Sequence, residues 1–148
     1  MPPILVDTNV LVYFFDHNTP KKQERAELVL NRLREAGLGR LSTQNLAEFV
    51  NTAMRKLDPP MTAAKALEQA ILFSVTWQVF NLTPQIVLEA ARAVRDYKLA
   101  YYDAQMWAAA RLNQIPVIFS EDFQDGQILE GVRFVDPFAP TFDLEAWL

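Results

Sequence analysis

Short apolar runs alternate along the chain with stretches whose apolar residues recur at helical spacing. The apolar runs predict strands at residues 4–6, 41–42, 75–82, 116–119 and 132–135. The helical spacing, with caps and breakers such as Pro20, Gly37, Pro59 and Pro84, predicts helices over about 9–15, 19–37, 45–58, 62–73, 83–97 and 102–113. A polar turn is expected at 120–126, and a tail with Pro137 and Pro140 is expected to wrap over the surface.

Strands that alternate with helices need crossover connections, which produce a mostly parallel sheet. The pattern therefore predicts an α/β fold of three layers, in which helices cover both faces of the sheet. Residues 1–148 contain no repeat, linker or low-complexity segment and are expected to form a single domain. In such sheets ligands bind beyond the carboxyl ends of the strands, so polar residues at those ends are candidates for function.

Composition restricts the chemistry that the chain can perform. Half of it, 51%, is hydrophobic, there is no cysteine, and His17 is the only histidine. Disulfides, thiolate zinc sites, a cysteine nucleophile and a histidine-rich metal site are therefore excluded. Any metal would be held by oxygen ligands, which favours hard cations such as Mg²⁺ or Mn²⁺.

Charge and hydropathy bear on location and on partners. No signal peptide is recognisable, and the apolar stretch around 70–82 is too short and polar to span a bilayer, so a cytoplasmic protein without a membrane partner is expected. The net charge of −4 argues against a protein that coats nucleic acid. The basic residues near the N-terminus either form a solvated helix face or contact phosphates; they are Lys21, Lys22, Arg25, Arg32, Arg34 and Arg40.

Four carboxylates occupy positions that the fold would bring to one edge of the sheet. Asp7 follows the first strand, Asp122 follows the strand at 116–119, and Glu48 lies in the helix after the strand at 41–42. Asp103 opens the helix at 102–113 and joins the others only if that helix begins at the same edge. Each acid also has a structural explanation: Asp7 and Asp103 as helix caps, Glu48 as a capping-box partner of Asn45, and Asp122 as a turn residue. One shared site explains all four together.

Crowded carboxylates repel one another, and a divalent cation removes that repulsion while it supplies Lewis acidity. Thr8 and Ser120 can donate hydroxyl hydrogen bonds to this group, and Asn9 can orient Asp7 through its amide. Helix capping is the alternative role for Thr8 and Asn9.

These motifs resemble those of PIN-domain proteins, and among them the VapC-type toxins of bacterial toxin–antitoxin pairs. The resemblance covers nearly the whole chain, and its motifs are Val6-Asp7-Thr8-Asn9, Asn45 to Phe49, Tyr102-Asp103-Ala104, Ser120-Glu121-Asp122, Gln124-Asp125-Gly126 and Asp136-Pro137-Phe138. Together, in this order, they are far more specific than any one of them alone.

The resemblance implies an endoribonuclease that uses Mg²⁺ or Mn²⁺, forms a homodimer and is covered by a small antitoxin. The family's metal-site acids map to Asp7, Glu48, Asp103 and Asp122, with Asp7 and Asp103 expected to hold the principal ion. Asp125 is a candidate additional ligand or substrate-positioning residue, and Glu121 could take the place of Asp122. The metal would activate a water that attacks the RNA phosphorus, and Glu48 could accept the proton.

The alternative is a PIN-like module that binds RNA or protein without catalysis. Loss of the acids would indicate such a module, and all four are present. Phosphatase and nucleotide-binding folds are disfavoured, since Asn9 stands where a second aspartate would be needed and no glycine-rich turn follows the first strand. Tyr101 and Tyr102 are expected to pack in the interior in preference to stacking on a base.

Overall fold

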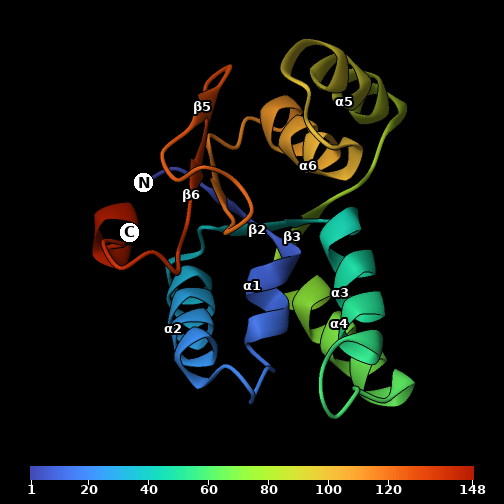
Figure 1. Ribbon diagram of the computed structural model, residues 1–148, viewed down its shortest axis with the longest axis vertical. Coiled ribbons are helices and arrows are strands. Elements are labelled where there is room, and N and C mark those ends of the chain that lie inside the picture. The colour runs from blue at the N-terminus through green and yellow to red at the C-terminus, as the bar shows by residue number, and fades with distance from the viewer.

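A six-stranded sheet forms the centre of the computed structural model, which describes residues 1–148 (Figure 1). The strands lie in the order β3-β2-β1-β4-β6-β5 and are parallel except for β5, which forms an antiparallel hairpin with β6. Their bounds are Ile4–Val6 (β1), Gly39–Ser42 (β2), Gln78–Phe80 (β3), Val117–Phe119 (β4), Ile128–Leu129 (β5) and Val132–Val135 (β6). This is the three-layer α/β architecture that the sequence predicts.

Helices cover both faces of the sheet, four on one side and two on the other (Figure 1). The first side carries α1 (Thr8–Tyr13), α2 (Pro20–Ala36), α3 (Thr43–Arg55) and α4 (Ala63–Thr76); the second carries α5 (Pro84–Tyr97) and α6 (Tyr101–Leu112). A 3₁₀ helix, η1 (Leu144–Trp147), ends the chain. No helix combines the length and the apolar character that a membrane crossing would require.

Alternate residues of each strand enter opposite cores, because successive side chains of a strand point to opposite faces. Ile4 and Val6 pack with residues of α1, α2 and α3, whereas Leu5 packs with residues of α5 and α6. Both cores are closed, so every residue of β1 and β4 is buried. This explains why the first strand has an uninterrupted apolar run instead of an alternating one.

The register of the central strands brings their carboxyl ends together. Val6 of β1 pairs with Phe119 of β4, so the next residues, Asp7 and Ser120, leave the sheet side by side. The Asp7 N–H donates to the Phe119 carbonyl at 2.9 Å, which continues the ladder by one step. The start of α1 and the loop after β4 are thereby fixed against each other.

Three expectations about the fold are wrong. The predicted strand at 75–82 is reduced to residues 78–80, because α4 continues to Thr76 and the exposed face of its last turn was mistaken for strand alternation. The short strand β5 lies in a segment for which no strand was predicted. The tail does not simply wrap over the surface, since Leu144 of η1 is buried and Phe142 and Trp147 contact the Phe119 ring edge-on.

Gly39 provides a test of the packing between β2 and α4. A Cβ atom at this position would overlap the indole ring of Trp77, which is buried. Gly39→Ala is therefore expected to lower the free energy of unfolding by about 2 kcal/mol, in the range for overpacked cores, as measured by urea denaturation. The same Gly39→Ala change in a Trp77→Leu background, where the indole ring is absent, serves as the comparison and should cost about 1 kcal/mol or less relative to that background. Equal effects would show that Trp77 does not confine this strand.

Candidate active site

Asp7 lies at the centre of the candidate site and is fixed by two short hydrogen bonds. It caps α1, with the Thr8 N–H donating to its Oδ1 at 2.6 Å, and the Ser120 hydroxyl donates to its Oδ2 at 2.7 Å. The residue is 7% exposed. Asp7 therefore has the capping role that the sequence offered as an alternative and, at the same time, faces the groups of the proposed site.

Asn9 connects Asp7 with Asp122. Its Nδ2 donates to Asp7 Oδ2 at 3.4 Å and to Asp122 Oδ2 at 3.2 Å, across 113 residues of sequence. The Asp122 N–H donates to the Ser120 hydroxyl at 3.1 Å, so Ser120 also touches both acids. The buried Oδ1 of Asn9 has no hydrogen-bond donor. The Thr8 hydroxyl does not contact these acids but donates to the Asn45 carbonyl at 3.4 Å.

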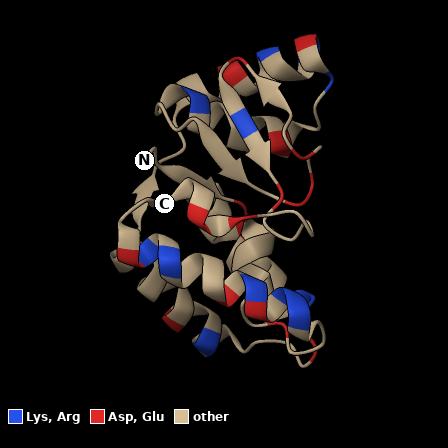
Figure 2. Ribbon diagram, turned by 90° about the vertical axis from the view of Figure 1, so that its left-hand side faces the viewer, with Lys and Arg blue, Asp and Glu red and all other residues tan.

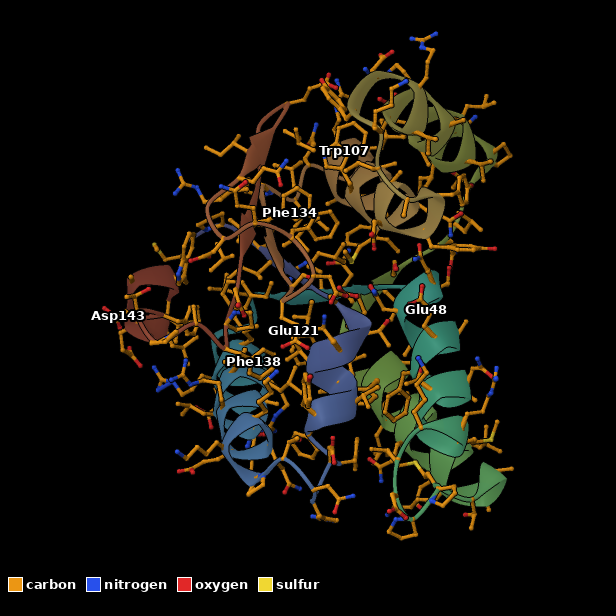
Figure 3. All side chains as sticks on the ribbon, viewed as in Figure 1. Glu48, Trp107, Glu121, Phe134, Phe138 and Asp143 are labelled. Atoms are coloured by element: carbon orange, nitrogen blue, oxygen red, sulfur yellow. The ribbon has the colours of Figure 1, made fainter.

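Glu48 is brought to the site by α3, which begins where β2 ends. Ser42 caps this helix and forms a capping box with Asn45, so Glu48 is not a member of the box. It lies one turn further along, half-buried, at the end of α3 nearest α6 (Figure 3). Gln44 Nε2 donates to Glu48 Oε1 at 2.6 Å, which leaves Oε2 free of protein hydrogen bonds.

Asp103 lies in the first turn of α6, where Ala100 and not Asp103 is the N-cap residue. Burial raises the pKa of Asp103, and the charges of Asp122 and Glu48 raise it further. The charges of Asp122 and Glu48 also raise the pKa of Asp7, so the same two acids act on both Asp7 and Asp103. Asn9 joins Asp7 to Asp122 by hydrogen bonds, and the pairing of Asp7 with Asp103 around a principal ion stays a prediction.

Three of the four acids line one open cavity of about 350 Å³ between α1 and α3. Its walls include Asp7, Glu48 and Asp122, together with Asp16, Tyr13, Thr52 and one cationic residue, Lys56. Figure 2 shows acidic positions in the loops that follow the strand arrowheads, whereas Lys and Arg lie mainly on helices. Asp103 is outside this cavity.

The charge of these acids is not neutralised by the protein. Burial, followed by the charges of Asp122 and Glu48, raises the pKa of Asp7 to about 7, although the hydrogen bonds from Ser120 and Thr8 oppose this. None of Asp7, Glu48, Asp103 and Asp122 forms an ion pair. The structure thus holds a set of repelling carboxylates, a state that a bound cation would relieve.

The oxygen-rich donor set, the unpaired Asn9 Oδ1 and the raised pKa of Asp7 fit a hard divalent cation. No three acidic side chains lie close enough together to ligate a single ion directly. Asp7 and Asp122, which both accept hydrogen bonds from the Asn9 amide, are residues that could hold such an ion.

Two other candidate acids have different partners. Glu121 accepts hydrogen bonds from Tyr13 Oη at 2.6 Å and Lys22 Nζ at 2.8 Å, so its charge is already paired and it does not replace Asp122 (Figure 3). Asp125 accepts from the Asp136 N–H at 2.9 Å and lines a separate cavity beside Arg133. Neither side chain contributes to the cavity of Asp7.

Sequence reasoning did not single out Lys56, Tyr13 or Thr52 as cavity residues. Lys56 is the C-cap of α3 and looks like an ordinary helix-terminal cation, while Tyr13 looks like part of an apolar helix face. Thr52 and Lys56 follow Glu48 at i+4 and i+8, and Tyr13 follows Asn9 at i+4, so each lies on the same helix face as a predicted site residue. Helical spacing counted from the predicted residues could therefore have found them.

Comparisons with known proteins agree with this architecture. A chain of a toxin–antitoxin complex from Klebsiella pneumoniae is 21% identical, with a TM-score of 0.66 over 90% of this chain and 97% of that chain. A chain of DNA-bound VapBC from Salmonella typhimurium is 18% identical, with a TM-score of 0.64 over 93% of this chain and 99% of that chain. VapC20 from Mycobacterium tuberculosis, a sarcin-ricin loop cleaving toxin, is 20% identical, with a TM-score of 0.61 over 88% of this chain and 98% of that chain. No curated protein matches the sequence significantly.

At these identities the structural matches show a shared fold. The sequence itself matches the family model described as the PIN domain over residues 4–124. That range runs from the first residue of β1 to the loop after β4, and it includes Asp7, Glu48, Asp103 and Asp122. The chain therefore belongs to the PIN-domain family.

Proposed function

We propose that this protein is an endoribonuclease that depends on Mg²⁺ or Mn²⁺ and acts as the toxin of a toxin–antitoxin pair. The observation that carries the proposal is the buried carboxylate of Asp7, which shares a cavity with Glu48 and Asp122 and has no cationic partner. A protein that used these acids only for stability would be expected to pair them, as it pairs Glu121 with Lys22.

When bound, the cation would supply Lewis acidity toward the scissile phosphate. Asp7 and Asp122 would hold it, and Asn9 and Ser120 would keep both carboxylates in place through the hydrogen bonds described above. Glu48 Oε2, free of protein donors, would accept the proton of the attacking water, while Gln44 holds Oε1. Asp103, whose pKa the charges of Asp122 and Glu48 raise, would add a further carboxylate to those that hold the ion.

An acidic cavity repels an RNA phosphate, so substrate binding needs cations as well as the metal. Lys56 is the one cationic residue of the cavity wall; it is exposed and forms no ion pair. We therefore assign it to a phosphate next to the one that is cleaved.

Lys56→Ala is expected to raise KM for RNA by about 3- to 10-fold with little change in kcat, because one phosphate contact is lost. The slope of log affinity against log salt should decrease by about 0.7 for single-stranded RNA. Lys65→Ala is the matched control, since Lys65 is also exposed and unpaired but lies on α4, outside the cavity. If both variants change the salt slope equally, Lys56 has no special place in the substrate path.

The toxin role is supported by the shared fold, since the similar structures include toxin–antitoxin assemblies and a toxin that cleaves the sarcin-ricin loop. By the same likeness we propose a small antitoxin that covers the cavity, and a homodimer. Coexpression with the product of an adjacent short reading frame, followed by native mass spectrometry, tests both assemblies.

The activity itself is tested by incubating the purified protein with labelled total tRNA, rRNA and mRNA, with and without EDTA. Cleavage that EDTA abolishes and that added Mg²⁺ or Mn²⁺ restores supports the proposal. Binding of RNA without cleavage under every metal condition would instead support a PIN-like binding module. Cleavage unaffected by EDTA would reject the role given to the carboxylates.

A further inference from the structure

A second cavity, of about 490 Å³, adjoins the acidic one. Glu48 lines both cavities, so the two meet at this side chain. The second cavity is otherwise bounded by Ala47, Leu82 and Tyr102 and by the polar residues Thr43, Gln44 and Gln105. The second cavity therefore borders a residue of the candidate active site.

The amide groups of the second cavity are already occupied. Gln44 Nε2 donates to Glu48 Oε1 and to the Tyr102 carbonyl, at 2.6 and 2.9 Å. Gln105 Nε2 donates to Gln44 Oε1 at 3.0 Å. The surface that remains open is mostly apolar and no cation lines it, so it suits a flat, uncharged group and not a phosphate.

Tyr102 supplies an aromatic surface at this place. It is 66% exposed, contrary to the expectation that it packs in the interior. The Tyr101 ring lies edge-on to it, with centroids 5.2 Å apart at 82°, and Gln44 holds its backbone carbonyl. The ring is thus positioned by its neighbours yet open to solvent, and it directly precedes Asp103.

We propose that this second cavity binds an unpaired nucleobase of the RNA, stacked on Tyr102, next to the phosphate that is cleaved. The inference rests on the proposed function and deepens it, because it assigns Tyr102 and the second cavity to the base beside the cleaved phosphate. A base within a duplex would have to leave its stack and its pair to enter the cavity, whereas a base in a loop is already free. Stacking on an aromatic ring is indifferent to base identity, so selection here is for an unpaired base.

The test uses the Asp7→Asn protein and a single-stranded oligonucleotide with 2-aminopurine at successive positions. This variant is expected to cleave too slowly to consume the RNA, and it has lost one of the negative charges that repel phosphate, so binding can be measured without the metal. One position should show quenched fluorescence on binding. Adding Tyr102→Ala should relieve the quenching and weaken affinity by roughly 10-fold, whereas Tyr102→Phe and Tyr102→Trp should retain both. Tyr97→Ala, which removes another exposed tyrosine far along α5, is the control.

The inference is overturned if Tyr102→Ala binds as tightly as its parent, or if Tyr102→Phe is as weak as Tyr102→Ala. It is also overturned if Tyr102→Ala leaves RNA affinity unchanged but converts a dimer to a monomer in light scattering, because the cavity would then be a subunit interface. Metal-dependent cleavage by the protein without any substitution is measured in parallel. If that protein cleaves RNA, the proposed function stands even when this inference fails. If it cleaves no RNA, the proposed function fails and the binding result stands alone.

Discussion

Asp7→Asn is expected to reduce metal-dependent RNA cleavage by on the order of 10³-fold while the protein remains folded. Asparagine has nearly the same shape as aspartate and can still accept the Thr8 N–H at the start of α1. It lacks the negative charge that would hold the cation together with Asp122. The measurement is the initial rate of cleavage in Mg²⁺, with circular dichroism to verify the fold.

Asp125→Asn makes the same chemical change outside the cavity and serves as the matched control. Asp125 contacts the Asp136 N–H and does not line the cavity of Asp7, so its variant should cleave within about 3-fold of the unaltered protein. An Asp7→Asn protein that cuts RNA as fast as the Asp125→Asn protein would contradict the assignment of the site.

The second large effect is a pH-dependent loss of stability in the metal-free protein. Asp7 has an ordinary pKa of 3.8 and a pKa of about 7 in the folded protein. Below 3.8 both states hold the proton. As the pH rises from 3.8 to 7 the unfolded chain releases it first, so stability falls, by on the order of 4 kcal/mol once the pH exceeds 7. The raised pKa of Asp103 acts in the same direction.

This loss can be followed as the difference in free energy of unfolding between the unaltered protein and Asp7→Asn, in EDTA, from pH 5 to pH 8. The asparagine variant should become the more stable of the two as the pH rises. Added Mg²⁺ should stabilise the unaltered protein at pH 8 and have little effect on the variant. A difference that does not change with pH would mean that Asp7 is better solvated than its burial indicates.

Most of the fold could be predicted because local signals coincide with global ones. The apolar run of β1, the proline that begins α2 and the glycine that ends it all lie where the sequence indicates. The region of α4 and β3 failed because the exposed face of α4 is unusually apolar, with Val75 75% exposed. An apolar residue there did not indicate burial, so the periodicity was misleading.

The candidate site could be predicted as far as the carboxyl ends of β1, β2 and β4 define it, which places Asp7, Glu48 and Asp122 at one cavity. Asp7 and Ser120 follow paired strands, and their contact results directly from the register. The segment after β4 offers Glu121, Asp122 and Asp125, and no spacing rule separates them. The choice depends on Lys22, a residue 99 positions away on another helix, which pairs with Glu121 and leaves Asp122 to the cavity.

The C-terminal η1 helix has a practical consequence for every experiment above. Phe142 and Trp147 pack against Phe119, the last residue of β4 and the neighbour of Ser120. An affinity tag fused after Leu148 would follow directly on the residues that pack against Phe119 and could displace them. Met1 is 66% exposed and precedes β1 by three residues, so a tag there would not disturb this packing. Purification should therefore use a cleavable tag at the N-terminus, so that a disturbance of β4 by the tag is not mistaken for a lack of activity.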